Sequence, residues 1–397
     1  MPTGRNFFSV DTRAVPTLSA WQLGKKSAEL LITRYVQDHG EWPKAFGLTA
    51  WGTANMRTGG DDIAQALALI GVKPIWDAAS RRITGFEVIP VSVLGRPRVD
   101  VTLRISGFFR DAFPEQIVLF DQAVRKIASL DESEDDNPIA YRYKNDVQRL
   151  KSAGLDDEAA EKQAGYRVFG ARPGTYGTGV QELLDNGQWE NRDDISKAWI
   201  AHSSYAYGKT EDRDQHNLLD ERLRYLDAVV QNQDNREHDL LDSGEYYAFE
   251  GGMATAVASK RGAWPKVYHN DMSRPERPLI KTLQEEIGRT LHGRAVNPKW
   301  IKGAMRHGFK GAVEMAATVD YLFAFAATTN AVSNHHFEAI YKAYINNTKI
   351  REFLESNNPA ALREIAYKLN QAITRELWKP RSNSARFELE ELQKGFK

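Results

Sequence analysis

The sequence predicts an α/β fold in which a parallel-sheet α/β unit near the N-terminus is followed by a mainly helical region. Between residues 41 and 130, short apolar runs alternate with segments of helical periodicity, a pattern typical of a parallel sheet with helices on both faces. The chain has 397 residues, 42% of them hydrophobic, which can supply two or three domains with cores. We expect an N-terminal segment and helix over residues 1–40 and an α/β domain over 41–130. An acidic connector with a helix is expected over 131–165, and a mainly helical domain with a glycine-rich loop over 166–397.

The first half of the chain supplies the elements of the sheet. An amphipathic helix is expected over about 20–38, and a short apolar strand ending at glycine over 46–52. Residues 61–69 are expected to form a helix whose first-turn acids complement the helix dipole. Three further strands and a helix are expected at 74–76, 86–90, 99–105 and 114–130.

Two loops of this unit are candidates to contact a ligand. In parallel sheets, ligands bind at the loops that follow the carboxyl ends of the strands. Here these loops are residues 51–60 and 106–111, and their polar groups Arg57, Arg110 and Asp111 are expected near a substrate. In the alternative interpretation Arg110 and Asp111 only cap and brace the following helix, and the residues alone favour that.

A glycine-rich loop opens the second half. An acidic connector, residues 131–136, leads into Asn137-Pro138, which is typical of a helix start. A strand at 166–169 is then followed by the loop at 170–179 and a helix at 180–186. Such a loop presents free backbone N–H groups to an anion, although its spacing fits neither a dinucleotide fingerprint nor a P-loop.

Gly208-Lys209-Thr210 is not a P-loop either, because Ser203 stands where that motif needs a glycine. We therefore do not expect this chain to hydrolyse ATP.

The strongest candidate for a site is the stretch from Asn232 to Ser243. Apolar residues before it (Leu219 to Val230) recur at helical spacing, and the pattern then lapses. If the helix continues, Asp234, His238 and Asp242 share one face, which suits a divalent cation or a base oriented by carboxylates. The chain has no cysteine, so a metal would bind N and O atoms. The alternative is a solvated helix face with ion pairs.

A polar run at 269–278 holds two arginines outside any helix. Pro275 and Pro278 keep Arg274 and Arg277 in an extended loop, as recognition of a carboxylate would need. A structural loop pinned by arginine–carboxylate pairs is equally compatible. Beyond this run, helices are expected at 282–291, from 297 onward, and through most of 321–397.

Composition excludes several classes of protein. Lysine plus arginine and aspartate plus glutamate both number 53, so the net charge is zero and neither nucleic acid nor an anionic membrane is expected as a partner. The start of the chain lacks the apolar region of a signal peptide, and the most apolar run, 321–332, is too short to span a bilayer. A cytoplasmic protein is expected.

Several of these motifs resemble a known family. The stretch from Asn232 to Ser243, then Phe249-Glu250-Gly251-Gly252 and Tyr268-His269-Asn270-Asp271, resemble the large subunit of aerobic cobaltochelatase, CobN, a relative of the magnesium-chelatase H subunits. The resemblance covers essentially the whole chain, including residues 2–11 and both sheet loops. It matches the C-terminal third of that subunit, so a fragment or the product of a split gene is expected.

The resemblance implies a component of an ATP-dependent cobaltochelatase, an enzyme that inserts Co²⁺ into hydrogenobyrinic acid a,c-diamide in aerobic cobalamin biosynthesis. It implies that ATP and Mg²⁺ are used by separate AAA+ subunits, CobS and CobT, which agrees with the missing P-loop. Two other interpretations stay open: a fragment of a magnesium-type chelatase acting on a porphyrin, and a non-catalytic tetrapyrrole-binding or assembly module.

With this resemblance, roles can be assigned as hypotheses. The catalytic candidates are His238, Glu237, Asp242 and Glu250, and the metal candidates are His238, Asp234, Asp242 and His269. Substrate binding is assigned to Arg57, Arg110, Gly174, Gly177, Arg274 and Arg277. His202 receives no role.

Overall fold

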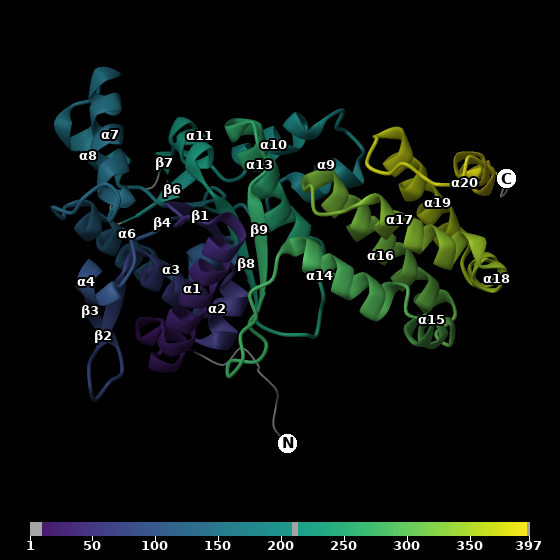
Figure 1. The fold of residues 1–397 in the computed structure, drawn as a ribbon, viewed down its shortest axis with the longest axis horizontal. Coiled ribbons are helices and arrows are strands. Elements are labelled where there is room, and N and C mark those ends of the chain that lie inside the picture. Colours follow the sequence, from purple (N-terminus) through teal and green to yellow (C-terminus); the bar gives the residue numbers. More distant parts are fainter. Residues whose placement is uncertain (1–9, 209–212, 395–397) are drawn as a thin grey trace.

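The structure of the protein is a computed structural model that describes residues 10–208 and 213–394. Its centre is a seven-stranded sheet with the strand order β7-β6-β5-β4-β1-β8-β9 (Figure 1). Strands β5, β4, β1, β8 and β9 run parallel to one another, and β6 and β7 are antiparallel additions at one edge. The predicted α/β class is therefore confirmed. The strands are Ala45–Ala50 (β1), Asp100–Ile105 (β4), Val168–Gly170 (β5), Tyr205–Tyr207 (β6), Arg213–Asp214 (β7), Ala228–Gln233 (β8) and Lys266–Asp271 (β9).

Helices cover both faces of this sheet. Alternate side chains of a strand point to opposite faces, so Phe46 and Leu48 of β1 enter one core while Ala45 enters the other. The first core is closed by α1 (Leu18–His39), α3 (Asp61–Ile70) and α6 (Pro114–Ala128). The second is closed by helices from later in the chain: α10 (Arg192–Ala201), α11 (His216–Tyr225), α13 (Gly252–Arg261) and the C-terminal helices.

Several helix boundaries follow from local signals. Helices α1, α3 and α6 lie close to the predicted ranges. Asn137 caps the next helix, α7 (Pro138–Ser152), with its side chain accepting from the N–H of Ala140. The other helices before residue 283 are α2 (Gly52–Thr58), α4 (Val91–Leu94), α5 (Gly107–Ala112), α8 (Asp157–Ala164), α9 (Val180–Asp185) and α12 (Gly244–Tyr246), with a 3₁₀ turn η1 (Thr12–Ala14) and a π-helical turn η2 (Tyr247–Gly251).

Two of the predicted strands do not join the main sheet. They form β2 (Val72–Trp76) and β3 (Ile83–Val88), which pair antiparallel in a separate two-stranded hairpin that projects from the body (Figure 1). The expectation that they belong to the parallel sheet is wrong. Only a short turn separates them, and a parallel pair needs a longer crossover connection.

The prediction that residues 219–230 form one helix is wrong for the residues after 225. Helix α11 ends at Tyr225, and Ala228 to Gln233 form β8, which lies between β1 and β9. Every residue of β8 is buried, so its continuous apolar start reflects burial on both faces rather than a helix face.

The sheet crosses the predicted boundary between residues 165 and 166. The strands β5, β6, β7, β8 and β9 all come from the region expected to be mainly helical, yet they share one sheet with β1 and β4. The division into four domains stays a prediction.

From residue 283 the described chain is helical, as predicted. These helices extend from one side of the sheet towards the C-terminus, on the right of Figure 1. No helix within 10–208 and 213–394 combines the length and the apolarity needed to cross a membrane. The helices are α14 (Leu283–Thr290), η3 (Leu291–Ala295), α15 (Pro298–Met305), α16 (Phe309–Thr328), α17 (Asn334–Ile340), η4 (Tyr341–Asn346), α18 (Thr348–Asn357), α19 (Pro359–Thr374) and α20 (Ala385–Lys394).

Candidate functional site: a cavity at the carboxyl ends of the parallel strands

A cavity of about 710 Å³ lies where the sheet strands end. Trp51, which follows β1, and Thr53 of α2 line it, as do Ser106, which follows β4, and the first two residues of α5. The glycine-rich loop after β5, helix α9, and the segment around residues 245–249 complete its walls. Both segments that the sequence placed at carboxyl ends of strands therefore line this cavity, as the rule for parallel sheets predicts, although each forms a short helix, α2 or α5, rather than a loop.

Aromatic side chains from four separate segments line the cavity: Trp51, Phe108, Tyr176 and Phe249. Trp51 packs edge-on against Phe249, with ring centroids 5.6 Å apart. Tyr176 is 63% exposed, so one of its faces is open to a ligand. The arrangement suits a flat, largely apolar molecule, because aromatic rings stack favourably on such faces.

Arg110 holds the glycine-rich loop in place from behind. Its Nη1 donates to the carbonyl oxygens of Ala171, Arg172 and Thr175, at 3.2, 2.8 and 3.0 Å. Its Nε and Nη2 donate to Asp111 at 2.6 and 2.9 Å, and Asp111 also accepts from the hydroxyl of Tyr176. The Asp111 carboxylate raises the pKa of Arg110 above its usual value. Arg110, which was predicted to bind the substrate, therefore uses its donors on the protein's own loop. This is close to the alternative interpretation, in which Arg110 only braces the structure.

Arg104 ties the same loop to the floor of the cavity. This side chain is buried, and its Nε donates to Ser203 Oγ at 2.8 Å. Its Nη2 donates to the carbonyl oxygens of Gly177 and His202, at 2.9 and 3.1 Å, and its guanidinium lies 5.0 Å from the Phe249 ring centroid. Burial lowers the pKa of Arg104 to about 9. The sequence analysis missed this residue, because a lone arginine in a buried strand carries no local signal.

Gly174 and Gly177 shape the loop through their backbone. Both have φ of +78°, a left-handed conformation that favours glycine, and an added Cβ would meet no atom within 4 Å at either. Gly177 lines the cavity, whereas Gly174 is not among the lining residues. Their assignment to substrate binding stays a prediction.

The stretch after β8 is a loop, so the predicted helix face does not exist. Asp234 is buried and accepts from Arg57 Nε and Nη2 at 2.7 and 2.9 Å. The two predicted site groups thus neutralise each other, and the pKa of Arg57 is raised by this pairing. His238 is mainly exposed, and its Nδ1 lies 3.2 Å from Asp242 Oδ1. Burial raises the pKa of Asp242.

Glu250 and His269 form a separate, fully buried pair. Glu250 Oε1 lies 2.8 Å from His269 Nδ1, and neither side chain is exposed. His269 Nε2 lies 3.3 Å from Gln233 Oε1. Burial raises the pKa of Glu250. Glu250 sits on the π-helical turn η2, directly after the cavity-lining Phe249, and such turns are frequent at functional sites.

The predicted metal ligands do not come together. Within the described ranges, no three His, Cys, Asp or Glu side chains are close enough to hold a metal ion. The set of Asp234, His238, Asp242 and His269 is instead divided among three pairs. These are the Arg57–Asp234 ion pair, the exposed His238–Asp242 pair and the buried Glu250–His269 pair.

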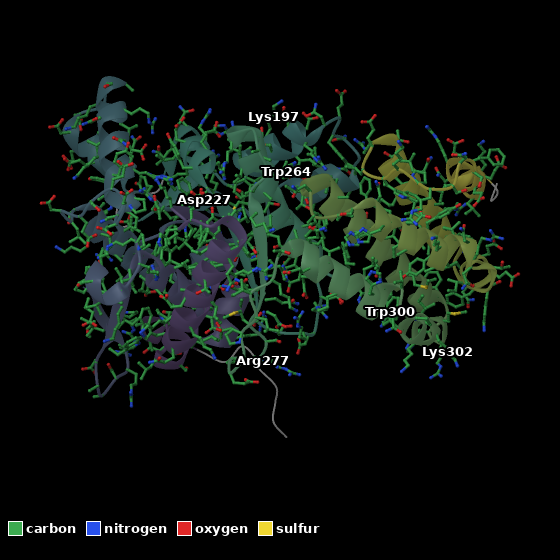
Figure 2. The ribbon with its side chains drawn as sticks, in the orientation of Figure 1. Lys197, Asp227, Trp264, Arg277, Trp300 and Lys302 are labelled. Carbon is green, nitrogen blue, oxygen red and sulfur yellow. The ribbon has the colours of Figure 1, made fainter. Side chains whose placement is uncertain are left out.

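The remaining predicted residues lie on the surface. Arg274 and Arg277 are exposed in the loop that follows β9, where the N–H of Arg277 donates to the carbonyl of Arg274 at 2.9 Å. Figure 2 shows Arg277 at the lower edge of the molecule. Glu237 is exposed beside His238. None of the three is among the residues that line the cavity. The family-like residues 2–8, and Lys209-Thr210, lie outside the described residues.

Several lining residues were not predicted. The cavity is also lined by Glu182 and Asp185 of α9, by Glu245, and by His202, which received no role. Phe108 lies in a segment that the carboxyl-end rule had already selected, and Tyr176 lies in the predicted glycine-rich loop, so both positions could have been found. No local sequence pattern predicts that α9 faces the cavity, because its orientation depends on packing between distant segments.

Comparison with known proteins gives consistent results. The family model described as CobN/Magnesium Chelatase matches residues 1–385. The aerobic cobaltochelatase subunit CobN of Sinorhizobium sp. is 62% identical over 98% of this chain, which covers 30% of that subunit. The magnesium-chelatase H subunit of Rhodobacter capsulatus is 32% identical over 96% of the chain and 31% of its own length. The solved catalytic subunit of cobaltochelatase from Mycobacterium tuberculosis superposes with a TM-score of 0.93 at 41% identity, covering 99% of this chain and 33% of that one.

Proposed function

This chain belongs to the CobN/magnesium chelatase family, and on that premise we propose that it is part of the catalytic subunit of an aerobic cobaltochelatase. The chain spans about 30% of the length of its CobN relative, so the activity proposed is that of the longer subunit. The reaction is the insertion of Co²⁺, the substrate metal, into hydrogenobyrinic acid a,c-diamide during cobalamin biosynthesis. The 62% identity with a CobN protein, against 32% with a magnesium-chelatase relative, supports cobalt over magnesium.

The observation that carries this proposal is the aromatic cavity at the carboxyl ends of β1, β4 and β5. Its volume of about 710 Å³ is in the usual range for small-molecule sites. Phe108 and Tyr176 are exposed rings on which a flat conjugated macrocycle can stack, and the largely buried Trp51 and Phe249 form apolar wall beside them. We propose that part of the tetrapyrrole binds here.

Metal insertion needs a base for the inner N–H protons of the ring and a site where the ion loses its water. We propose that His238 accepts a proton, with Asp242 orienting its imidazole, because an accessible imidazole beside a carboxylate suits that role. The buried Glu250–His269 pair is proposed to exchange protons next to the cavity wall. Asp234 is proposed to hold Arg57, and Glu237, Arg274 and Arg277 stay predicted contributors.

The energy source is proposed to lie outside this chain. ATP and Mg²⁺ would be used by AAA+ subunits, CobS and CobT, in a cytoplasmic complex. The sequence supports this, because its Gly208-Lys209-Thr210 lacks the first glycine of a P-loop.

The test uses the complete large subunit with its AAA+ partners and ATP. Co²⁺ and Mg²⁺ are each offered with hydrogenobyrinic acid a,c-diamide and with a porphyrin, and metallation is followed by absorbance. We expect metallation only for Co²⁺ with the corrin precursor. Magnesium insertion into the porphyrin would contradict the proposal in favour of a magnesium chelatase. Corrinoid binding without metallation would contradict it in favour of a non-catalytic binding module.

A further inference from the structure

A basic corner lies in the C-terminal helical region, where α15 meets α16. The chain has no acidic residue from 287 to 313, although acids and bases are equal in number over the whole sequence. Two arginines of this segment are already paired, Arg289 with Glu286 and Arg294 with Asp239. The cations that remain are exposed and form no ion pair within residues 10–208 and 213–394: Lys299, Lys302, Arg306 and Lys310.

Two apolar side chains are exposed among these cations. Phe309 is 65% exposed and Val313 is 44% exposed, and residues four apart on a helix lie on one face. The next acid along α16, Glu314, is exposed at the edge of the corner. Figure 2 shows Lys302 at the lower right of the molecule. An exposed apolar pair surrounded by unpaired cations is typical of a surface that binds another molecule.

The backbone of the basic corner is held in place by close packing of its two helices. A Cβ at Gly311 of α16 would lie 1.9 Å from the carbonyl oxygen of Ala304 in α15, so only glycine lets the two helices come this close. The cations on both helices therefore keep fixed positions relative to one another. A partner can bind them without ordering the backbone first, which lowers the entropic cost of association.

Helix α16 connects the basic corner to the wall of the cavity. It runs from Phe309 to Thr328, a length of about 30 Å at 1.5 Å per residue. Towards its other end, Tyr321 and Phe325 pack against Tyr247 of η2, with ring centroids 6.1 and 6.2 Å apart. Because η2 carries two of the residues that line the cavity, α16 joins the corner to the site as one rigid element.

We propose that the basic corner is the docking surface for an acidic, partly apolar segment of the ATP-hydrolysing subunits. The inference rests on the proposed function, which places the energy source outside this chain. Carboxylates of the partner pair with the four exposed cations, and its apolar side chains cover Phe309 and Val313. A force applied at the corner then acts on one end of a helix whose other end packs against the cavity wall.

The apolar pair and the overall charge favour a protein over a nucleic acid as the partner. Phosphates would engage the cations but would leave Phe309 and Val313 exposed to water. The net charge of the whole chain is zero, whereas a protein segment with carboxylates and apolar side chains complements both features of the corner.

The experiment measures binding of the complete large subunit to the AAA+ subunits in the presence of ATP. The variant carries Lys299→Gln, Lys302→Gln and Lys310→Gln. Its affinity should be about tenfold lower, because three interface charges are lost, and it should depend less steeply on added salt than that of the wild type. The matched control removes three other exposed lysines that form no ion pair within the described ranges, and should bind as the wild type does: Lys25→Gln, Lys126→Gln and Lys144→Gln.

Metallation separates docking from chemistry. With saturating AAA+ subunits, the corner variant should regain the wild-type kcat, and its dissociation constant for hydrogenobyrinic acid a,c-diamide should be unchanged, because the cavity is intact. All the replaced side chains are exposed, so both variants should fold, which thermal denaturation verifies.

Several results would overturn the inference and leave the proposed function standing. These are wild-type affinity for the AAA+ subunits in the corner variant, an equal loss of affinity in the control variant, and loss of binding to an RNA oligonucleotide in place of loss of the AAA+ subunits. A wild-type complex that binds its AAA+ subunits through the corner but inserts no Co²⁺ would instead overturn the proposed function.

Discussion

At the scale of single residues, the charged groups proposed for the site, none of which is among the residues that line the cavity, fall into engaged and accessible ones. Arg57, Arg104 and Arg110 are bound by groups of the protein itself, so they shape the site rather than reach into it. Glu250 and His269 are fully buried together. His238 is 68% exposed and oriented by Asp242, which makes it the accessible base among the predicted residues.

Substituting His238 with alanine should abolish metallation while leaving the fold intact. The side chain is exposed, so little packing is lost, but the proposed proton acceptor is removed. Metallation by the complete enzyme and the unfolding midpoint are measured together. His216→Ala is a matched control, because His216 is also about half exposed and lies near a carboxylate, Asp220, four residues on. Unchanged turnover in the His238 variant would refute the assignment.

Asp62 gives the protein a predictable pH dependence. Burial raises the pKa of this carboxyl to about 7, and it accepts a hydrogen bond from Asn232 at 2.9 Å. Between about pH 4 and 7 the folded state therefore holds a proton that the unfolded chain has lost. The contribution of Asp62 to stability is thus greatest below pH 4, falls as the pH rises to 7, and is constant above that.

The variant Asp62→Asn should remove this dependence. The unfolding free energy of the variant minus that of the wild type should be larger at pH 8 than at pH 5. The increase should be up to a few kcal/mol, since one pKa unit corresponds to about 1.4 kcal/mol. Denaturant unfolding at the two pH values measures it. A stability difference that is the same at both would show that Asp62 is ionised in the folded protein.

At the scale of elements, close packing explains the glycine pair that follows Glu250. A Cβ at Gly251 would lie 2.3 Å from Thr328 Oγ1, and one at Gly252 would lie 2.3 Å from Trp199 Cδ1. Thr328 belongs to α16 and Trp199 to α10, so these glycines let η2 and α13 approach two helices at once. This contact fixes the wall that carries Phe249 and Glu250.

Gly252→Ala should destabilise the protein by about 1–3 kcal/mol, the usual cost of overpacking a buried contact. Trp199 is fully buried and cannot move aside into solvent. Gly293→Ala is the control, because an added Cβ there meets no atom within 4 Å. Equal unfolding free energies for the two variants would contradict the packing explanation.

At the scale of the whole molecule, the cavity is an assembly of segments that are far apart in sequence. Trp51, Phe108, Tyr176 and Phe249 meet because β1, β4, β5 and β8 end at the same edge of one sheet. The C-terminal helices pack behind the segment that holds Phe249. A ligand site of this kind depends on the complete fold rather than on one motif.

Tyr176→Ala should weaken tetrapyrrole binding roughly threefold to tenfold, which corresponds to a stacking contribution of about 0.5–1.5 kcal/mol. The ring is 63% exposed, so stability should change little. Tyr367→Ala is the control, since Tyr367 is 45% exposed on α19 and does not line the cavity. Absorbance titration gives both affinities, and an equal affinity for the Tyr176 variant and the wild type would argue against stacking at this wall.

By itself the sequence determined the α/β class, most helices and the loops that border the cavity. Caps such as Asn137, the left-handed glycines Gly174 and Gly177, and helical periodicity act within a few residues, so their signals are local. The family resemblance was likewise carried by short motifs.

Only the tertiary structure decided that Ala228 to Gln233 form a strand, that Asp234 pairs with Arg57, and that the acids of α9 face the cavity. Burial on both faces of a central strand overrides the helical spacing of its apolar residues. Without a helix after β8, Asp234 takes its partner, Arg57, from a distant segment, while His238 and Asp242 pair with each other within the loop. The physical reason is that a side chain's partner is set by the neighbours of its strand or helix, and those come from distant parts of the chain.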